Sequence, residues 1–362
     1  MVFRQLSLKA IKIILKKSDF YCELLQKLLI LLSILLQVMR ERMRKQVFML
    51  FFLLLGWLDV NAQFDAERSQ YMNNQVAINP AAVASNDMFN LMGTYRMQWA
   101  GFSDAPVDMF FSANTPLTIA GTKHGVGLSF MSDEAGLFTN QSVLFQYSYK
   151  MKVFRGVMSL GIGLGGVNQT FDGASADVTG NGGSLAEDDG YHTDSDPLVD
   201  KSEMNDLAFD VCFGAYYSED DFYVGLSVAH LNRPSFEMTE TTESYLPRIF
   251  YLVGGYNIRT SNPLLVLKPS ALIKTEFSSF QMDASFLMEY KKKFAGGLSY
   301  RWGGAFVFMA EYNLISGLAL GYSYDLPTSK MVVSGGSHEI SLRYSFRPEF
   351  AKKNKYKSER IL

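Results

Sequence analysis

Apolar and polar residues alternate along short segments throughout most of the chain. Between Phe222 and Ala229, for example, Phe222, Val224, Leu226 and Val228 are separated by Tyr, Gly and Ser. A period of two is typical of β-strands, whose successive side chains point to opposite faces. Fourteen segments are predicted as strands on this basis: 89–96, 109–115, 126–133, 140–151, 156–168, 206–217, 222–231, 248–257, 264–274, 281–290, 294–302, 304–313, 317–324 and 337–346.

The two faces of these segments favour a membrane barrel over a soluble β-sandwich, which is the alternative. One face is large, apolar and aromatic, the other is small or polar, and charged residues fall mainly in the turns. A soluble sandwich would expose many charges on its outer face. Membrane barrels instead turn an apolar face to lipid and use an even number of strands of about ten residues. The predicted fold is all-β: a transmembrane antiparallel β-barrel of about 14 strands over residues 88–346.

The composition agrees with this class and excludes several others. The chain is 48% hydrophobic, 14% aromatic and only 19% charged, unlike disordered proteins or coiled coils. Lys and Arg (34) nearly balance Asp and Glu (36), which argues against nucleic-acid binding. Cys22 and Cys212 are the only cysteines, which excludes a disulfide scaffold.

Residues 43–62 have the three parts of a secretory signal peptide: a positive start, an apolar stretch and small residues before the cleavage site. These parts are Arg44 and Lys45, residues 47–58, and Val60 with Ala62. Cleavage is predicted between Ala62 and Gln63. A buried N-terminal helix is the alternative interpretation.

Four other segments lie outside the predicted strands. Residues 1–42 are interpreted as a leader produced by a start codon assigned too early, with a short signal anchor as the alternative. Residues 63–87 are predicted to form an N-terminal periplasmic arm or a plug. Residues 347–362 are predicted to form a basic periplasmic tail, because an even strand number brings both ends to one side. The Asp- and Gly-rich segment 171–205 is predicted to be an extracellular loop; a calcium site there is the less favoured alternative to a solvated acidic loop.

Motifs for catalysis or cofactor binding are mostly rejected. Gly161, Gly163 and Gly166 match G-x-G-x-x-G, but they alternate with apolar residues within one predicted strand and no helix follows. The four histidines lack metal-ligand spacing. Ser337 and His338 are adjacent in a strand and so point to opposite faces. The chain is therefore predicted not to be an enzyme and to have no catalytic residues, no cofactor and no metal; an outer-membrane hydrolase with distant catalytic partners is a minor alternative.

Three ordered groups of short motifs span the predicted barrel. They are S-Q-Y-M at 69–72 with I-N-P-A at 78–81; R-M-Q-W-A-G at 96–101 with A-P at 105–106; and Y-S-Y-D at 322–325 with S-H-E-I at 337–340 and L-R-Y at 342–344. In this order they resemble the PorP/SprF family of type IX secretion system membrane proteins. One departure is A-V-A-S at 82–85, where the family more often continues Y-A-G.

The resemblance implies an outer-membrane β-barrel of the type IX secretion system that supports export or surface anchoring of proteins, including a gliding adhesin, through protein–protein contacts. The implied partners are outer-membrane lipid, periplasmic type IX ring and peptidoglycan-binding components, and exported proteins with C-terminal sorting domains or an adhesin. Nucleic acid is not among them.

Ten residues are singled out by these motifs and by the last strand. The family motifs place structural or plug roles on Asn79, Pro80, Arg96, Trp99, Gly101 and Pro106. The last strand resembles the terminal aromatic strand used as an outer-membrane assembly signal, through His338, Glu339, Tyr344 and Phe346. The alternative function is a FadL-like outer-membrane transporter of hydrophobic small molecules. A transporter predicts an apolar pocket in the lumen, whereas an anchor predicts a filled or polar lumen.

Overall fold

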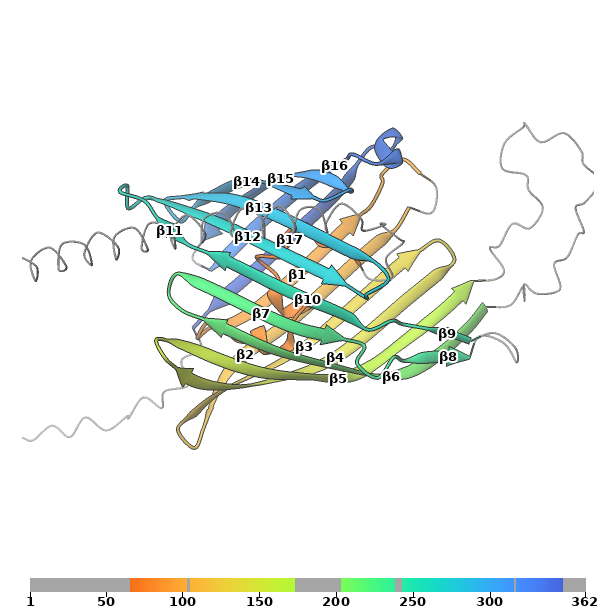
Figure 1. Cartoon of the computed structure of the whole chain (residues 1–362), viewed down its shortest axis with the longest axis horizontal. Helices are drawn as coiled ribbons and strands as arrows, with labels where there is room; N and C mark the ends of the chain where they lie inside the picture. The colour runs from red at the N-terminus through yellow and green to blue at the C-terminus, as the bar shows by residue number, and fades with distance from the viewer. Residues whose placement is uncertain (1–65, 103–104, 173–202, 238–242, 316, 348–362) are drawn as a thin grey trace, which may run out of the picture. The chain divides into compact units, whose positions relative to one another are not determined.

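The computed structural model describes residues 66–102, 105–172, 203–237, 243–315 and 317–347. Fourteen strands in this part of the chain close into an antiparallel barrel, in which β1 (Phe89–Met97) pairs with β17 (Ser337–Phe346) (Figure 1). The strands between them, in order around the barrel, are β2 (Val107–Ile119), β3 (Thr122–Ala135), β4 (Phe138–Val153), β5 (Gly156–Asp172), β6 (Glu203–Ser218), β7 (Phe222–Ala229), β10 (Ile249–Tyr256), β12 (Leu265–Thr275), β13 (Phe280–Tyr290), β14 (Phe294–Arg301), β15 (Ala305–Ile315) and β16 (Leu318–Pro327). Two short strands, β8 (Ser235–Glu237) and β9 (Glu243–Tyr245), form a separate hairpin, and β11 (Ile258–Arg259) pairs with β12.

The predicted barrel is confirmed, and each of the fourteen predicted segments coincides with one of its strands. Several observed strands are longer than predicted; β5, for example, contains 17 residues. Its last residues, Gln169 to Asp172, are mostly polar but remain paired with β4 and β6. Apolar alternation marks only the part of each strand that faces lipid, whereas the hydrogen-bonded pairing of the strands continues beyond that part.

The two faces of the barrel wall have opposite characters. Large apolar side chains such as Phe111, Phe213 and Phe306 are about half exposed on the outer face. Small or polar residues such as Ser112 and Ser323 are buried on the inner face. This distribution is favourable only if hydrocarbon covers the outer face. No helix in the described residues is long and apolar enough to cross a membrane.

The two rims of the barrel differ in their connections. At the short-turn rim, tight turns join β2 to β3, β4 to β5 and β6 to β7; β1 begins and β17 ends there. At the opposite rim, here called the loop rim, lie the connection between β1 and β2, the β8–β9 hairpin, and the segment containing the 3₁₀ turn η4 (Lys330–Val333). The predicted extracellular loop at 171–205 falls almost entirely outside the described residues.

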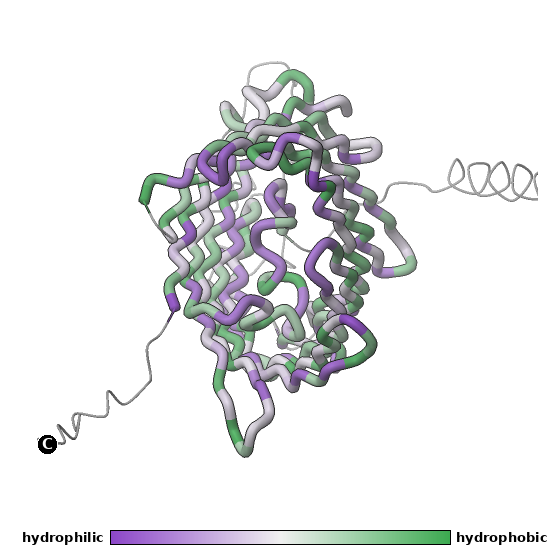
Figure 2. Tube along the Cα trace, turned by 90° about the vertical axis from the view of Figure 1, so that its left-hand side faces the viewer, coloured by the Kyte–Doolittle hydropathy of each residue, from purple (hydrophilic) through white to green (hydrophobic). Residues whose placement is uncertain are grey.

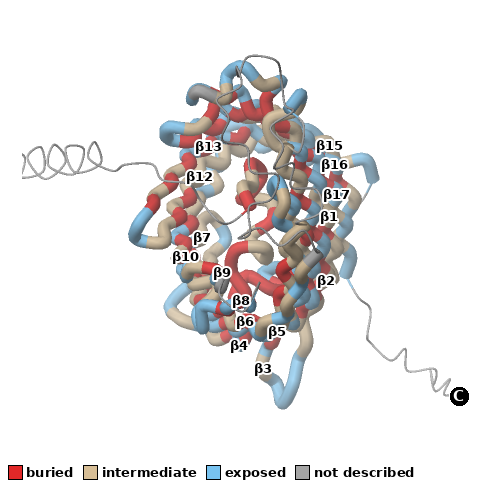
Figure 3. The backbone as a smooth tube through the Cα atoms, turned by 90° about the vertical axis from the view of Figure 1, so that its right-hand side faces the viewer, coloured by how far each residue is buried: buried red, intermediate tan, exposed pale blue. Residues whose placement is uncertain are grey.

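Residues 66–88, here called the lumen segment, lie inside the ring of strands (Figure 2). Many of these residues are buried, and the tube inside the ring of strands is largely red in Figure 3. The segment contains two 3₁₀ turns, η1 (Gln75–Ala77) and η2 (Pro80–Ala82). The second begins as the sequence favours: the Asn79 side chain caps the turn by accepting from the Ala81 nitrogen, and proline occupies the first position. The segment starts beside loop-rim residues and ends where β1 begins at the short-turn rim.

Candidate functional site

Two arginines form the centre of a buried ion cluster in the lumen. Arg96 extends from β1 and Arg301 from β14, and both side chains are almost fully buried. The Asp325 carboxylate on β16 bridges them, because its Oδ2 lies 2.9 Å from Arg96 Nη2 and 2.9 Å from Arg301 Nη1. Three more carboxylates complete the cluster: Glu67, Asp283 and Glu339.

Glu67 joins the lumen segment to this cluster. Its Oε2 lies 2.8 Å from Arg301 Nη1 and 3.2 Å from Arg96 Nη2. Burial by itself would raise the pKa of Glu67, but the charges of Arg301 and Arg96 outweigh burial, so the pKa lies below its ordinary value. Glu67 is therefore ionised at neutral pH and attracts both wall arginines.

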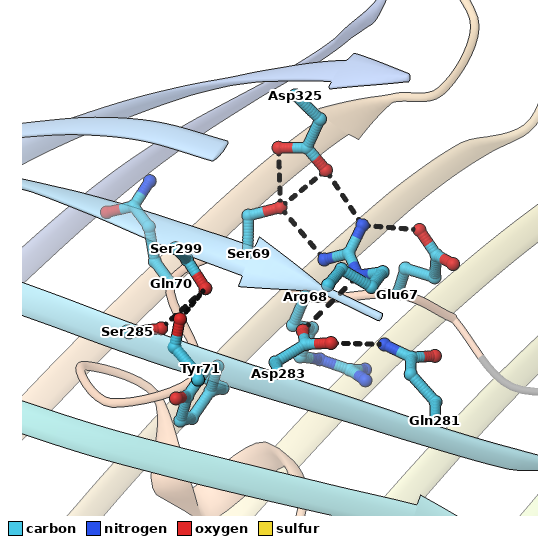
Figure 4. Close-up of polar contacts among 12 residues, drawn as sticks. Glu67, Arg68, Ser69, Gln70, Tyr71, Gln281, Asp283, Ser285, Ser299 and Asp325 are labelled. Atoms are coloured by element: carbon cyan, nitrogen blue, oxygen red, sulfur yellow. Dashed lines mark hydrogen bonds and ion pairs between the residues drawn. The ribbon is translucent and has the colours of Figure 1, made fainter. Parts of the chain in front are cut away.

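The Ser69 side chain binds Asp325 (Figure 4), and the backbones of Ser69 and Gln70 bind Glu339. Their two backbone N–H groups donate to the two oxygens of Glu339, at 2.8 and 3.1 Å. The Ser69 hydroxyl donates to Asp325 at 2.7 Å and accepts from Arg96 Nη1 at 2.9 Å. The charged wall residues thus find their partners in the lumen segment, and a displaced segment would leave buried carboxylates unsatisfied.

The ion cluster unites residues from all three motif groups. Ser69 belongs to the first group, Arg96 to the second, and Asp325 with Glu339 to the third. The motifs are far apart in sequence but meet because the first and last strands are neighbours, with Arg96 directly opposite Glu339 in the register. The motifs therefore mark the positions where the lumen segment is bound to the wall.

Tyr71 continues this attachment toward the short-turn rim. Its ring is fully buried against Ile78, Tyr251 and Leu272. Its hydroxyl forms a 3.2 Å hydrogen bond with Ser270, and burial raises the pKa of the phenol to about 12. The ring is therefore a neutral apolar anchor for the lumen segment.

Asn79 and Pro80 form a second attachment, against β5, β6 and β7. The Asn79 Nδ2 donates to the carbonyl oxygens of Ala215 and Leu226, at 3.1 and 3.2 Å. The wall carries glycines at the points of contact: Gly161, Gly214 and Gly225. A Cβ at Gly161 would overlap the Ala81 backbone, and one at Gly214 would overlap Asn79 Oδ1. Gly161, one of the glycines in the rejected G-x-G-x-x-G motif, thus leaves room for the lumen segment.

The residues after the Asn79 turn are also bound to the wall. Val83 O accepts from Ser148 Oγ at 3.1 Å, and Ala84 N donates to Asn114 Oδ1 at 3.0 Å. Ala84 has a φ of 51°, and its carbonyl accepts from Lys150 Nζ. Residues 82–85, where the sequence departs from the family pattern, thus contain a buried left-handed residue, Ala84, whose backbone groups hydrogen-bond to wall side chains.

Trp99, Gly101 and Pro106 lie in the connection between β1 and β2 at the loop rim. The Trp99 backbone nitrogen donates to Ser337 Oγ at 3.1 Å, and the Pro106 carbonyl accepts from the Gln98 backbone nitrogen at 2.8 Å. Gly101 has a φ of 99°, a conformation that favours glycine. These three residues shape the connection between β1 and β2.

The last-strand residues do not form one site. Glu339 points into the lumen, whereas His338, Tyr344 and Phe346 lie on the outer face. His338 Nδ1 lies 2.8 Å from the Tyr322 hydroxyl, and the Phe346 ring packs 4.9 Å from that of Phe89. The predicted cleavage residues Ala62 and Gln63 lie outside the described residues.

The three motif groups leave out several residues of the site. Glu67, Asp283 and Arg301 belong to the ion cluster but carry no motif. Arg301 nevertheless follows the inward register of Ser299 in β14, and Asp283 follows that of Ser285 in β13. A charged residue on the small, polar face of a predicted membrane strand is the signal that points to such positions. Among the described residues, no group of His, Cys, Asp and Glu is arranged to hold a metal ion.

Similar solved structures include a Pseudomonas aeruginosa FadL homologue (12% identity, TM-score 0.44), covering 75% of this chain and 93% of that one. The Acinetobacter baumannii outer membrane protein Omp33 (8% identity, TM-score 0.40) matches over 72% of this chain and 98% of its own. The CymD monoaromatic hydrocarbon channel (13% identity, TM-score 0.42) matches over 80% of this chain and 95% of its own. No curated protein matches the chain.

One protein family matches nearly the whole of the described barrel together with the lumen segment. The match runs over residues 60–344 and includes all three motif groups and the ion cluster. This result confirms the resemblance and places the barrel in the outer membrane. The chain belongs to the family of the type IX secretion system membrane protein PorP/SprF.

Proposed function

We propose that this outer-membrane barrel supports the export or surface anchoring of other proteins through protein–protein contacts, with its lumen closed. The family is one of secretion-system membrane barrels and not of enzymes. The observation that carries the proposal is the lumen segment, which is bound to the wall by the ion cluster and by Asn79. A polar, filled lumen is what an anchor requires.

Each rim would meet a different class of partner. Long connections of outer-membrane barrels face the outside, and short turns face the periplasm. The loop rim would therefore hold an exported protein with a C-terminal sorting domain or an adhesin. The short-turn rim, together with the basic residues at 347–362, would face the periplasmic ring and peptidoglycan-binding components. The predicted signal peptide at 43–62 supplies the export that this orientation needs.

A deletion strain tests the function at the level of the cell. The secreted and surface proteomes of the deletion strain and its parent would be compared. Loss of many proteins with C-terminal sorting domains identifies a general secretion component, and loss of one large adhesin together with gliding identifies a dedicated anchor. An unchanged secretome with impaired uptake of hydrophobic compounds would favour the transporter instead.

A locked lumen segment tests whether the lumen conducts cargo. Gln70 Oε1 accepts from Ser341 Oγ at 2.8 Å, so cysteines at these two positions would be close enough for a short thiol cross-linker such as dibromobimane. The comparison is between cross-linked and untreated cells carrying Q70C and S341C in a C212S background, complementing the deletion. An anchor predicts equal secretion in both samples. Secretion that stops on cross-linking would show that the segment must move to admit cargo.

A further inference from the structure

A cavity of about 560 Å³ opens among the loop-rim residues, within the roughly 300–1,000 Å³ typical of small-ligand sites. Its apolar walls include Trp99, Trp302, Phe138 and Phe280. Its polar lining comes from the inner faces of β2, β5 and β13 and includes Asp108, Gln169 and Gln281. Glu67 and Arg301 of the ion cluster also line the cavity, but the attachment of the lumen segment does not explain Asp108 and Gln169.

Three oxygen atoms of this lining are buried acceptors without a hydrogen-bond partner. They are Oδ1 of Asp108, Oε1 of Gln169 and Oε1 of Gln281, in side chains that are more than nine-tenths buried. The orientation of Gln281 is determined by its Nε2, which donates to the Asp283 carboxylate at 3.1 Å. Its oxygen must therefore point away from Asp283. Buried acceptors of this kind cost free energy unless a donor reaches them.

The charges around the cavity favour a cationic donor. Asp108 on β2 lies directly opposite Asp133 on β3, and both line the cavity. Arg301, the one Lys or Arg among the described lining residues, is bound to Glu67, Asp283 and Asp325. The charges of Arg68 and Arg96, which lie outside the cavity lining, also act on Asp108, but the Arg68 guanidinium donates its hydrogen bonds to the Ala66 carbonyl and the Met131 sulfur. The buried Asp108 carboxyl group, whose Oδ1 has no donor, requires a proton or a cation.

We infer that this cavity binds an alkylguanidinium or alkylammonium group, held by Asp108 and the two glutamine oxygens between aromatic walls. A guanidinium carries several N–H donors and no acceptor, which matches a lining of unpartnered oxygens. Its face also stacks favourably on tryptophan and phenylalanine rings. The group would be an arginine or lysine side chain of a polypeptide at the loop rim, or a free small amine. The inference does not depend on the role in secretion.

Intrinsic fluorescence provides the test, because Trp99 and Trp302 line the cavity and the only other tryptophan, Trp57, lies in the predicted signal peptide. The purified barrel in detergent would be titrated with a Gly/Ser peptide carrying one central arginine, with the same peptide carrying neutral citrulline, and with agmatine as a free amine. The arginine peptide or agmatine should change the fluorescence saturably. Citrulline should bind at least about tenfold more weakly, since a charged hydrogen bond is lost.

Matched variants locate the site. D108N should weaken binding about tenfold, whereas D87N, the same change at an exposed residue outside the cavity lining, should leave it unchanged. Q169M removes one neutral acceptor and should weaken binding by a smaller factor; it keeps the test valid if D108N fails to fold, which heat-modifiable migration on gels would reveal. Binding by agmatine alone assigns the site to free amines, and binding by the peptide assigns it to a side chain. Equal binding of citrulline, no binding at all, or unchanged affinity in both D108N and Q169M would overturn the inference and leave a water-filled cavity.

Discussion

Arg301 is the residue on which most of the ion cluster depends. Among the arginines in the described part of the chain, it alone contacts both Asp283 and Glu67, and it shares Asp325 with Arg96. Pairing offsets the large cost of taking these charges out of water. The sequence pattern can place such a residue on the inner face, but not identify its partners, because those come from strands and a segment remote in sequence.

Replacing Arg301 should release the lumen segment. R301M would remove the arginine that pairs with Asp283 and leave Glu67 and Asp325 with Arg96 alone, at a cost of about 3–5 kcal/mol for a broken buried pair. Protease cleavage within residues 66–88 should become much faster while the barrel stays heat-modifiable on gels. The matched control is R259M, because Arg259 is exposed and its pair with Asp221 is worth at most about 1 kcal/mol. Equal protection in R301M and wild type would contradict the assigned role.

Acid should weaken the same attachment through Glu67. Its pKa is lowered when the segment is bound, so ionised Glu67 contributes stability above the unbound pKa, and that contribution disappears as the pH falls through the lowered value. Protection of residues 66–88 from protease should therefore decrease at acidic pH. E67Q should be less protected at neutral pH and should lack the part of the pH dependence that belongs to this group. An identical pH profile in E67Q would assign the titration to other carboxylates.

At the scale of elements, alternation predicts the strands well because each wall residue faces either lipid or lumen. The lumen segment has no such period, and the sequence leaves open whether it is an arm or a plug. Its position depends on fitting against particular wall residues, above all the glycines beneath Asn79 and Pro80. Hydrophobic periodicity does not indicate where two backbones approach closely. It does place Gly161, Gly214 and Gly225 on the inner face.

A side chain at Gly161 should displace the lumen segment without disturbing the strand. In G161A the new Cβ would collide with the Ala81 backbone, which cannot move as a flexible side chain can. The control is G296A on β14, where the nearest atom to a new Cβ is the Met309 carbonyl oxygen at 3.8 Å. Protease cleavage around residues 78–84 should increase in G161A only. Comparable cleavage in the two variants would show that the close contact at Gly161 does not hold the segment.

For the whole molecule, the assignment of long connections to the outside can be tested by labelling. Ser278 lies in the exposed turn between β12 and β13 at the loop rim, and Ser261 lies in an exposed turn at the short-turn rim. In whole cells, a membrane-impermeant maleimide should label S278C but not S261C, whereas both should react after lysis. The native Cys212 is buried and should contribute little signal. Labelling of S261C alone would reverse the orientation and exchange the partners proposed for the two rims.

The union of the first and last strands has a consequence for how the protein is made. Ser69 is bound to Asp325 and Glu339, which lie 256 and 270 residues later in the chain. Contacts this distant form late, because the intervening chain must first be ordered. The lumen segment therefore cannot dock on the wall until β16 and β17 have formed. Docking of Ser69 then becomes a signal of completed biogenesis: a truncated or misassembled chain would keep its N-terminal segment exposed to periplasmic proteases, and only a finished barrel would protect it.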